Sequence, residues 1–305
     1  MKRRSMLRRT MLAASCLLAQ EPPVIRVQVK LVRLLVTVKD AKGEPIGALR
    51  REDFAVTDTG VAQEIAVFER STAQALSVSL LIDTSLSTAT HLEYESRAIQ
   101  GFLRALVGGG NLDDRAALYS FHDEVRMETG FTRTLDRVLK PLSRLKPLSG
   151  TSLYDAIWFA SQDLERRSGR RVLVVVTDGG DTTSRKKYRD ALEAAQRADA
   201  VIYSILVRPI AAEVGHNVGG ENALRTLAGG TGGRTFQPTL GKQLDTAFAA
   251  ILSDLRTQYL LGYYPRQLPA DAKPFHPVRV TLTGASRTAE GLQLLSRNGY
   301  YGDSD

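Results

Sequence analysis

Apolar residues in the middle of the chain follow two patterns that alternate along the sequence. Short, continuously apolar runs cover residues 78–82, 116–121, 172–176 and 201–207. Runs of this kind are typical of parallel strands that are buried on both faces. Between them, apolar residues recur at helical spacing, most clearly over residues 92–106. The alternation predicts an α/β fold with a doubly wound, mostly parallel sheet and helices on both of its faces.

The two ends of the chain show strand patterns instead. Apolar residues alternate with polar ones up to Leu31 and take the opposite parity from Val32, a change of phase that indicates a bulge or a strand that switches sheets. A few strands at either end would be marginally stable alone. We therefore expect the N-terminal β segment, residues 24–70, to pair with the C-terminal one, residues 258–301. Their small β-sandwich would carry the α/β domain, residues 76–257, as an insertion.

The first twenty residues have the form of an export signal. Five Lys and Arg residues precede a short apolar stretch over residues 11–19, so we predict a signal peptide at residues 1–20. The apolar stretch is well short of the ~20 residues of a membrane-spanning helix, and no later stretch is long enough. These five basic residues supply most of the formal charge of +8, which argues against a nucleic-acid partner. We expect a periplasmic, cell-surface or secreted protein.

Cys16 is the only cysteine of the chain and lies within the predicted signal peptide. An intramolecular disulfide is therefore impossible. Residues 13–16 resemble a degenerate lipoprotein cleavage box. Lipidation of Cys16 and simple cleavage near Ala19 both remain open.

Oxygen-bearing side chains follow two of the predicted strands and one loop. Asp83 ends the first apolar run and is followed by Ser85 and Ser87, Asp178 follows the third run, and Thr151 lies in a glycine-containing loop before a helical pattern. Ligands of open α/β sheets bind at the C-terminal ends of the strands. Hard oxygen donors suit Mg²⁺, Mn²⁺ or Ca²⁺. The sequence predicts that these five residues form a divalent-cation site, with Mg²⁺ the expected ion.

The order Asp-x-Ser-x-Ser, Gly-Thr, Thr-Asp-Gly resembles the metal-ion-dependent adhesion site (MIDAS) of von Willebrand factor type A (VWFA) domains over residues 76–257. The flanking segments are similar to the VWFA-related family described mainly from acidobacterial genomes. Four segments carry that similarity: residues 40–43, 51–54, 259–263 and 297–300.

The resemblance implies a role for each site residue. Ser85, Ser87 and Thr151 would coordinate the ion directly. Asp83 and Asp178 would coordinate it directly or through water. A further coordination position would be left for a carboxylate of a protein partner. Two positions depart from the family pattern, since Leu86 stands where glycine is frequent and Thr88 where methionine is frequent, but neither position supplies a ligand in the family.

Simpler interpretations exist for several of these residues. Asp83 could cap the following helix and the two serines could be turn residues. Asp181 is interpreted as a loop or helix-capping residue, and residues 229–233 as a flexible connection rather than a phosphate-binding loop. Four histidines share no metal-like spacing, and the sequence has no nucleophile elbow. These histidines are His91, His122, His216 and His276.

The sequence thus predicts an exported, metal-dependent adhesion or protein-binding module that recognises an acidic group and is not an enzyme. Two alternatives remain open. The first is an envelope scaffold in which the ion only stabilises the loops. The second is a metal-dependent hydrolase that uses the ion to activate water.

Overall fold

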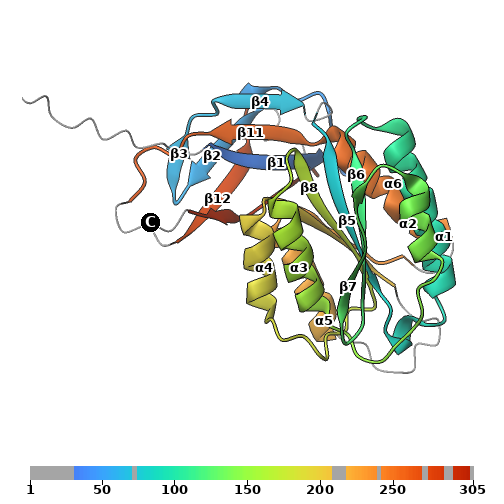
Figure 1. The fold of residues 1–305 in the computed structure, drawn as a ribbon. Helices are drawn as coiled ribbons and strands as arrows, with labels where there is room; N and C mark the ends of the chain where they lie inside the picture. The colour runs from blue at the N-terminus through green and yellow to red at the C-terminus, as the bar shows by residue number, and fades with distance from the viewer. Residues whose placement is uncertain are drawn as a thin grey trace, which may run out of the picture.

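The chain forms an α/β domain joined to a β-sandwich (Figure 1). The predicted signal peptide and Cys16 lie outside the part of the chain that the structure describes. Within the described part, no helix combines the length and the apolar character needed to cross a bilayer. The computed structural model describes residues 31–70, 74–207, 218–238, 242–269, 274–284 and 291–302.

The α/β domain is built on a six-stranded sheet with the strand order β10-β9-β8-β5-β6-β7. Neighbouring strands are parallel except at β7, which pairs antiparallel with β6 and was not predicted. The four apolar runs form β5, β6, β8 and β9, as expected. The strands are β5 (Leu76–Asp83), β6 (Arg115–Phe121), β7 (Val125–Thr132), β8 (Arg170–Thr177), β9 (Ala200–Leu206) and β10 (Thr235–Phe236).

Helices cover both faces of this sheet, which confirms the doubly wound arrangement (Figure 1). Leu80 and Ile82 of β5 pack with α1, α2 and α6 on one face. Leu81 points to the other face and packs with α3, α4 and α5. The helices are α1 (Leu92–Gly109), α2 (Leu135–Leu142), α3 (Leu153–Glu165), α4 (Tyr188–Arg197), α5 (Val218–Gly230) and α6 (Lys242–Thr257).

The sandwich consists of two four-stranded antiparallel sheets, β13-β1-β11-β4 and β14-β12-β2-β3. Both combine strands from the two ends of the chain, since Val36 pairs with Tyr259 and Val56 with Val280. This pairing confirms the predicted sandwich. Its strands are β1 (Val32–Lys39), β2 (Phe54–Asp58), β3 (Val61–Gln63), β4 (Val67–Arg70), β11 (Tyr259–Tyr263), β12 (Phe275–Leu282), β13 (Gln293–Ser296) and β14 (Gly299–Tyr301).

Strand β1 contacts both parts of the molecule. Leu34 and Val36 lie in the sandwich core, whereas Leu35 packs against the core of the α/β domain. The predicted change of phase begins before β1, in residues outside the described part, so it stays a prediction.

A buried ion cluster also connects the two parts. Lys39 Nζ of β1 lies 2.6 Å from Asp254 Oδ1 of α6, and Arg234 Nε lies 2.9 Å from Asp254 Oδ2. Lys39 is 2% exposed and Asp254 is fully buried. The cluster therefore holds α6 against the sandwich.

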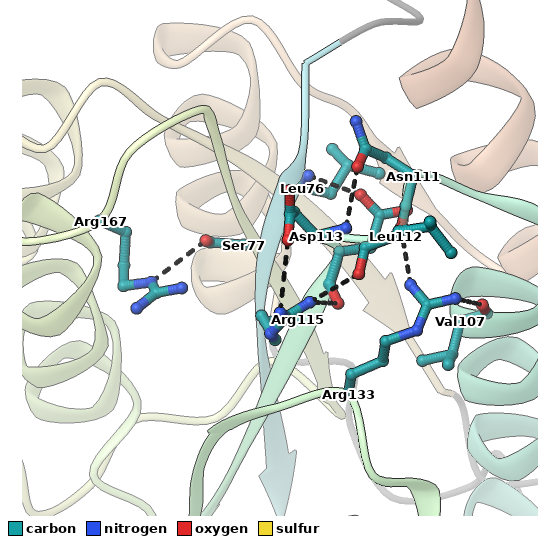
Figure 2. A network of polar contacts seen from close by, with 10 residues as sticks. Leu76, Ser77, Val107, Asn111, Leu112, Asp113, Arg115, Arg133 and Arg167 are labelled. Carbon is teal, nitrogen blue, oxygen red and sulfur yellow. Dashed lines mark hydrogen bonds and ion pairs between the residues drawn. The ribbon is translucent and has the colours of Figure 1, made fainter.

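A polar network holds the N-terminal ends of β5 and β6 (Figure 2). The Leu76 amide donates to Asp114 Oδ1 at 2.8 Å, so Asp114 joins the starts of the two strands. Arg133 donates to the carbonyl oxygens of Val107 and Asn111 at 2.8 and 2.7 Å. Both strands run from this edge toward the opposite edge of the sheet, where Asp83 lies.

The interpretation of residues 229–233 as a flexible connection is wrong. Gly230 ends α5, and the glycines after it pack closely against other backbone. Gly232 has φ +87°, and a Cβ there would lie 2.8 Å from the Arg297 amide nitrogen. Glycine is needed for this close approach rather than for flexibility.

Candidate metal site

Asp83 lies at the C-terminal end of β5 and is fully buried. Its Oδ1 accepts a hydrogen bond from the Ser85 amide at 2.9 Å, and its Oδ2 accepts one from Thr177 Oγ1 at 2.6 Å. A carboxylate oxygen can accept more than one hydrogen bond or ligand bond. Asp83 is therefore fixed in orientation and still has free acceptor capacity on both oxygens.

The two serines follow in a tight turn. Ser85 is buried, Ser87 is exposed, and a 3-10 helix, η3 (Leu86–Thr88), continues from Ser85. Thr88 Oγ1 lies 3.0 Å from the Asp83 carbonyl oxygen and 2.9 Å from that of Ser85, so it holds the turn closed. The hydroxyl oxygens of Ser85 and Ser87 lie 3.0 Å apart. Adjacent ligands of an octahedral Mg²⁺, each at ~2.1 Å, are separated by about 3.0 Å.

The loop that carries Thr151 is held between the other two segments. The Leu148 amide donates to the Thr84 carbonyl oxygen at 2.8 Å, which places this loop beside Ser85. On the other side, the Thr151 amide donates to Thr182 Oγ1 at 2.9 Å and the Thr182 amide to the Thr151 carbonyl oxygen at 2.8 Å. Thr151 itself is 5% exposed.

Asp178 follows directly after β8 and is partly exposed. Its Oδ1 accepts a hydrogen bond from the Gly180 amide at 3.1 Å, and its charge acts on the carboxyl of Asp83. Hydrogen bonds therefore join all three sequence segments at one edge of the sheet. Within the described residues, the side chains of Thr151 and Asp178 make no direct hydrogen bond to either serine.

The site concentrates negative charge in a buried setting. Burial raises the pKa of Asp83 to about 6, and the charge of Asp178 contributes to the increase. Burial also raises the pKa of Glu95 to about 8, with further contributions from Asp83 and Asp178. Among the described residues, no lysine, arginine or histidine forms an ion pair with these three carboxyls. A bound cation would offset this uncompensated charge.

These pKa shifts predict an inverse pH dependence for the metal-free protein. Asp83 and Glu95 bind protons more tightly in the folded than in the unfolded state, so lowering the pH through about 8 and then about 6 should stabilise the fold. We expect the melting temperature in chelator to rise between pH 8.5 and pH 6, roughly the window of the two pKa values. Bound Mg²⁺ should reduce the change of melting temperature with pH, because the ion favours the ionised carboxylates. A melting temperature that falls on acidification over this range would contradict the prediction.

The structure adds residues that the sequence analysis did not assign. Thr177 bonds to Asp83 and lies inside the Thr-Asp-Gly segment, so its position was a usable signal. Glu95 lies on the apolar face of α1, three residues after Leu92 and four before Ile99, and this helical spacing could have revealed it. Asp181 is a helix-capping residue, as expected, but it caps α3 by accepting a hydrogen bond from the Tyr154 amide at 3.2 Å.

The donor set fits a hard divalent cation. Within the described residues, no three or more His, Cys, Asp or Glu side chains gather closely enough to hold a metal ion between them. The predicted site has a different composition, with two carboxylates and three hydroxyls. Its serine hydroxyls, which are hydrogen-bonded to each other at 3.0 Å, are close enough to be adjacent ligands of one octahedral ion, and its buried Asp83 lacks a positive partner among the described residues.

The family profile of the von Willebrand factor type A domain matches residues 78–180, which include all five predicted site residues. The chain contains a von Willebrand factor type A domain. Its sheet order and two helical layers agree with this assignment. The similarity of the flanking segments to acidobacterial relatives stays a prediction.

Several solved structures are similar to this chain at low sequence identity. Proximal thread matrix protein 1 from the mussel byssus is 14% identical with a TM-score of 0.51, over 65% of this chain and 49% of that chain. The vWF domain of the type V pili tip protein Mfa5 from Porphyromonas gingivalis is 14% identical with a TM-score of 0.49, over 66% of this chain and 99% of that chain. The conserved hypothetical protein BatB from Bacteroides thetaiotaomicron is 17% identical with a TM-score of 0.49, over 59% of this chain and 98% of that chain. No curated protein matches the sequence.

Proposed function

We propose that this protein is an exported binding module whose type A domain recognises an acidic group of a protein partner through a divalent cation. One observation carries the proposal. The paired hydroxyls of Ser85 and Ser87 lie beside Asp83, a buried carboxylate with no positive partner among the described residues. This arrangement lies at the edge of the sheet where α/β folds bind ligands.

The residues divide the work of holding the ion. Ser85, Ser87 and Thr151 would supply neutral oxygens, while Asp83 and Asp178 would supply negative charge directly or through water. When bound, the ion, with Mg²⁺ expected and Mn²⁺ or Ca²⁺ possible, supplies a Lewis-acid centre for an external carboxylate. Neutral hydroxyl ligands leave most of its charge uncompensated, so exchange of a water ligand for a partner's carboxylate is favourable.

The rim of the site favours a partner with an apolar group beside its acidic residue. Leu86, between the two serines, is 63% exposed, and Leu148, bridged to Ser85, is 49% exposed. Burying these two leucines against a partner would remove apolar surface from water and so contribute to the binding free energy. The partner class is therefore an acidic residue with an apolar neighbour on a protein surface.

A peptide-display selection tests the proposal. Peptides that contain Asp or Glu should be enriched on the immobilised protein in Mg²⁺ and released by a chelator. Matched peptides with Asn or Gln at the same position should not bind, because a neutral amide is a much weaker ligand for a hard cation. Carboxylate and amide peptides that bind equally well, with or without chelator, would overturn the proposal.

The same preparation distinguishes the alternatives. If chelation lowers the melting temperature but leaves peptide binding unchanged, the scaffold function is correct. If Mn²⁺-dependent turnover of phosphate or ester substrates appears and is lost in an Asp83→Ala variant, the hydrolase function is correct. Export and the fate of Cys16 are part of the proposal, and mass spectrometry of the mature N-terminus tests both.

A further inference from the structure

Glu95 is a buried carboxylate outside the five predicted ligand residues. It lies in the first turns of α1, is fully buried, and neither of its carboxylate oxygens has a hydrogen-bond partner among the described residues. A buried carboxylate left without partners is strongly unfavourable unless it is protonated or balanced by a cation. Its retention in the apolar face of a helix therefore needs an explanation.

A continuous series of hydrogen bonds connects Glu95 to the site. Thr88 Oγ1 lies 3.0 Å from the Asp83 carbonyl oxygen, the His91 amide donates to the Thr88 carbonyl oxygen at 2.9 Å, and the Glu95 amide donates to the His91 carbonyl oxygen at 2.9 Å. Glu95 thus follows the turn that carries the serines by two hydrogen-bonded steps, from Thr88 to His91 and from His91 to Glu95. Burial raises the pKa of its carboxyl, and the negative charges of Asp83 and Asp178 raise it further.

We infer that Glu95 is a positioning residue for the cation, acting from the interior side through water molecules bound to the ion. Direct coordination is not part of this inference, because no three carboxylates, imidazoles or thiolates of the described residues gather closely enough to share an ion. Outer groups of this kind orient the ligands and tune the affinity of a metal site. The inference rests on the proposed function, because it requires that Asp83 and the serines bind a cation.

The proposed role of Glu95 also bears on which cations the site prefers. With Glu95, the site combines three carboxylates with neutral hydroxyls, and a small, strongly hydrated divalent ion retains several water ligands that an outer carboxylate can hold. A monovalent ion gains less from three negative charges. We therefore expect Glu95 to contribute to the preference for divalent over monovalent ions.

The test compares two single-charge variants of the same helix. Glu95→Gln removes the buried charge with little change in size, and Glu93→Gln removes an exposed charge two residues away. Calorimetric titration of the full mature chain with Mg²⁺ and Mn²⁺ should show binding weakened by about 10- to 100-fold in Glu95→Gln, as for other outer-shell changes, and unchanged in Glu93→Gln. Equal affinity in wild type and Glu95→Gln would overturn the inference.

A second measurement separates positioning from a structural role. In chelator, at a pH above the Glu95 pKa of about 8, Glu95→Gln should melt at or above the wild-type temperature, because an uncompensated buried charge is removed. In saturating Mn²⁺, the cation-induced rise in melting temperature should be smaller than in wild type. A variant with a lower melting temperature in chelator and an unchanged cation-induced rise would show a structural role and overturn the inference. Absence of cation binding in wild type would instead contradict the proposed function.

Discussion

Replacing Asp83 with alanine is expected to abolish Mg²⁺ binding, with a loss of affinity larger than the ~100-fold that an outer-shell change causes. Asp83 supplies one of the two carboxylates of the predicted site, and its two oxygens also hold the Ser85 amide and Thr177 Oγ1. The substitution therefore removes negative charge and loosens the turn that brings the two serine hydroxyls 3.0 Å apart. Isothermal titration of the purified chain with Mg²⁺ and Mn²⁺ measures the loss directly.

The control for this experiment is Asp113→Ala, which removes an exposed carboxylate at the opposite edge of the same sheet. It should bind Mg²⁺ as wild type does. In chelator, Asp83→Ala should remain folded, because its carboxyl is a buried charge without a positive partner in the described structure. Equal Mg²⁺ affinity in wild type and Asp83→Ala would exclude a cation site at this edge.

An Asp83→Asn variant separates charge from geometry. Asparagine keeps an oxygen acceptor and the size of the side chain, so the turn at Ser85 should persist, while the negative charge is lost. We expect Mg²⁺ affinity close to that of Asp83→Ala, because a hard divalent ion depends on charge as well as on shape. Retention of most of the affinity in Asp83→Asn would show that the position of the oxygen, rather than its charge, is what the site needs.

Much of the architecture follows from hydrophobic patterning. The strands that are buried on both faces are continuously apolar, so β5 and β8 are visible in the sequence, and their ends locate Asp83 and Asp178. By contrast, the burial pattern of β7 shows no buried residue, and this edge strand was missed. The strand patterns at the chain ends predict the sandwich. The local pattern does not determine the register in which Val36 pairs with Tyr259, because these residues are far apart in the sequence.

The sequence likewise predicts only part of the candidate site. The spacing of Asp83, Ser85 and Ser87 is local, and the segment order supplies Thr151 and Asp178. Glu95 was overlooked because a glutamate in a helix is usually assigned to the solvent face, although its spacing from Leu92 and Ile99 places it on the buried face. Sequence positions also cannot show that Thr177, rather than another hydroxyl, bonds to Asp83, since that contact joins residues of two separate strands.

Replacing Asp254 with alanine is expected to lower the free energy of unfolding by about 3–5 kcal/mol, the usual result of breaking a buried ion pair. The substitution leaves the Lys39 ammonium buried, with the Gly43 carbonyl oxygen at 2.9 Å as its remaining acceptor among the described residues. It also removes the contact between α6 and the sandwich strand β1. Urea unfolding at neutral pH measures the change.

Two further variants serve as comparisons for Asp254→Ala. In the double variant Lys39→Met with Asp254→Leu, most of the loss should be recovered, because apolar residues of similar size replace the two buried charges, while Arg234, whose side chain is 29% exposed, can still be solvated. Glu193→Ala breaks an exposed pair with Arg197, whose Nε lies 2.9 Å from the carboxylate, and should cost less than about 1 kcal/mol. If Asp254→Ala costs no more than Glu193→Ala, the buried cluster does not hold α6 to the sandwich, and the apolar packing of Leu35 against the α/β core must do so alone.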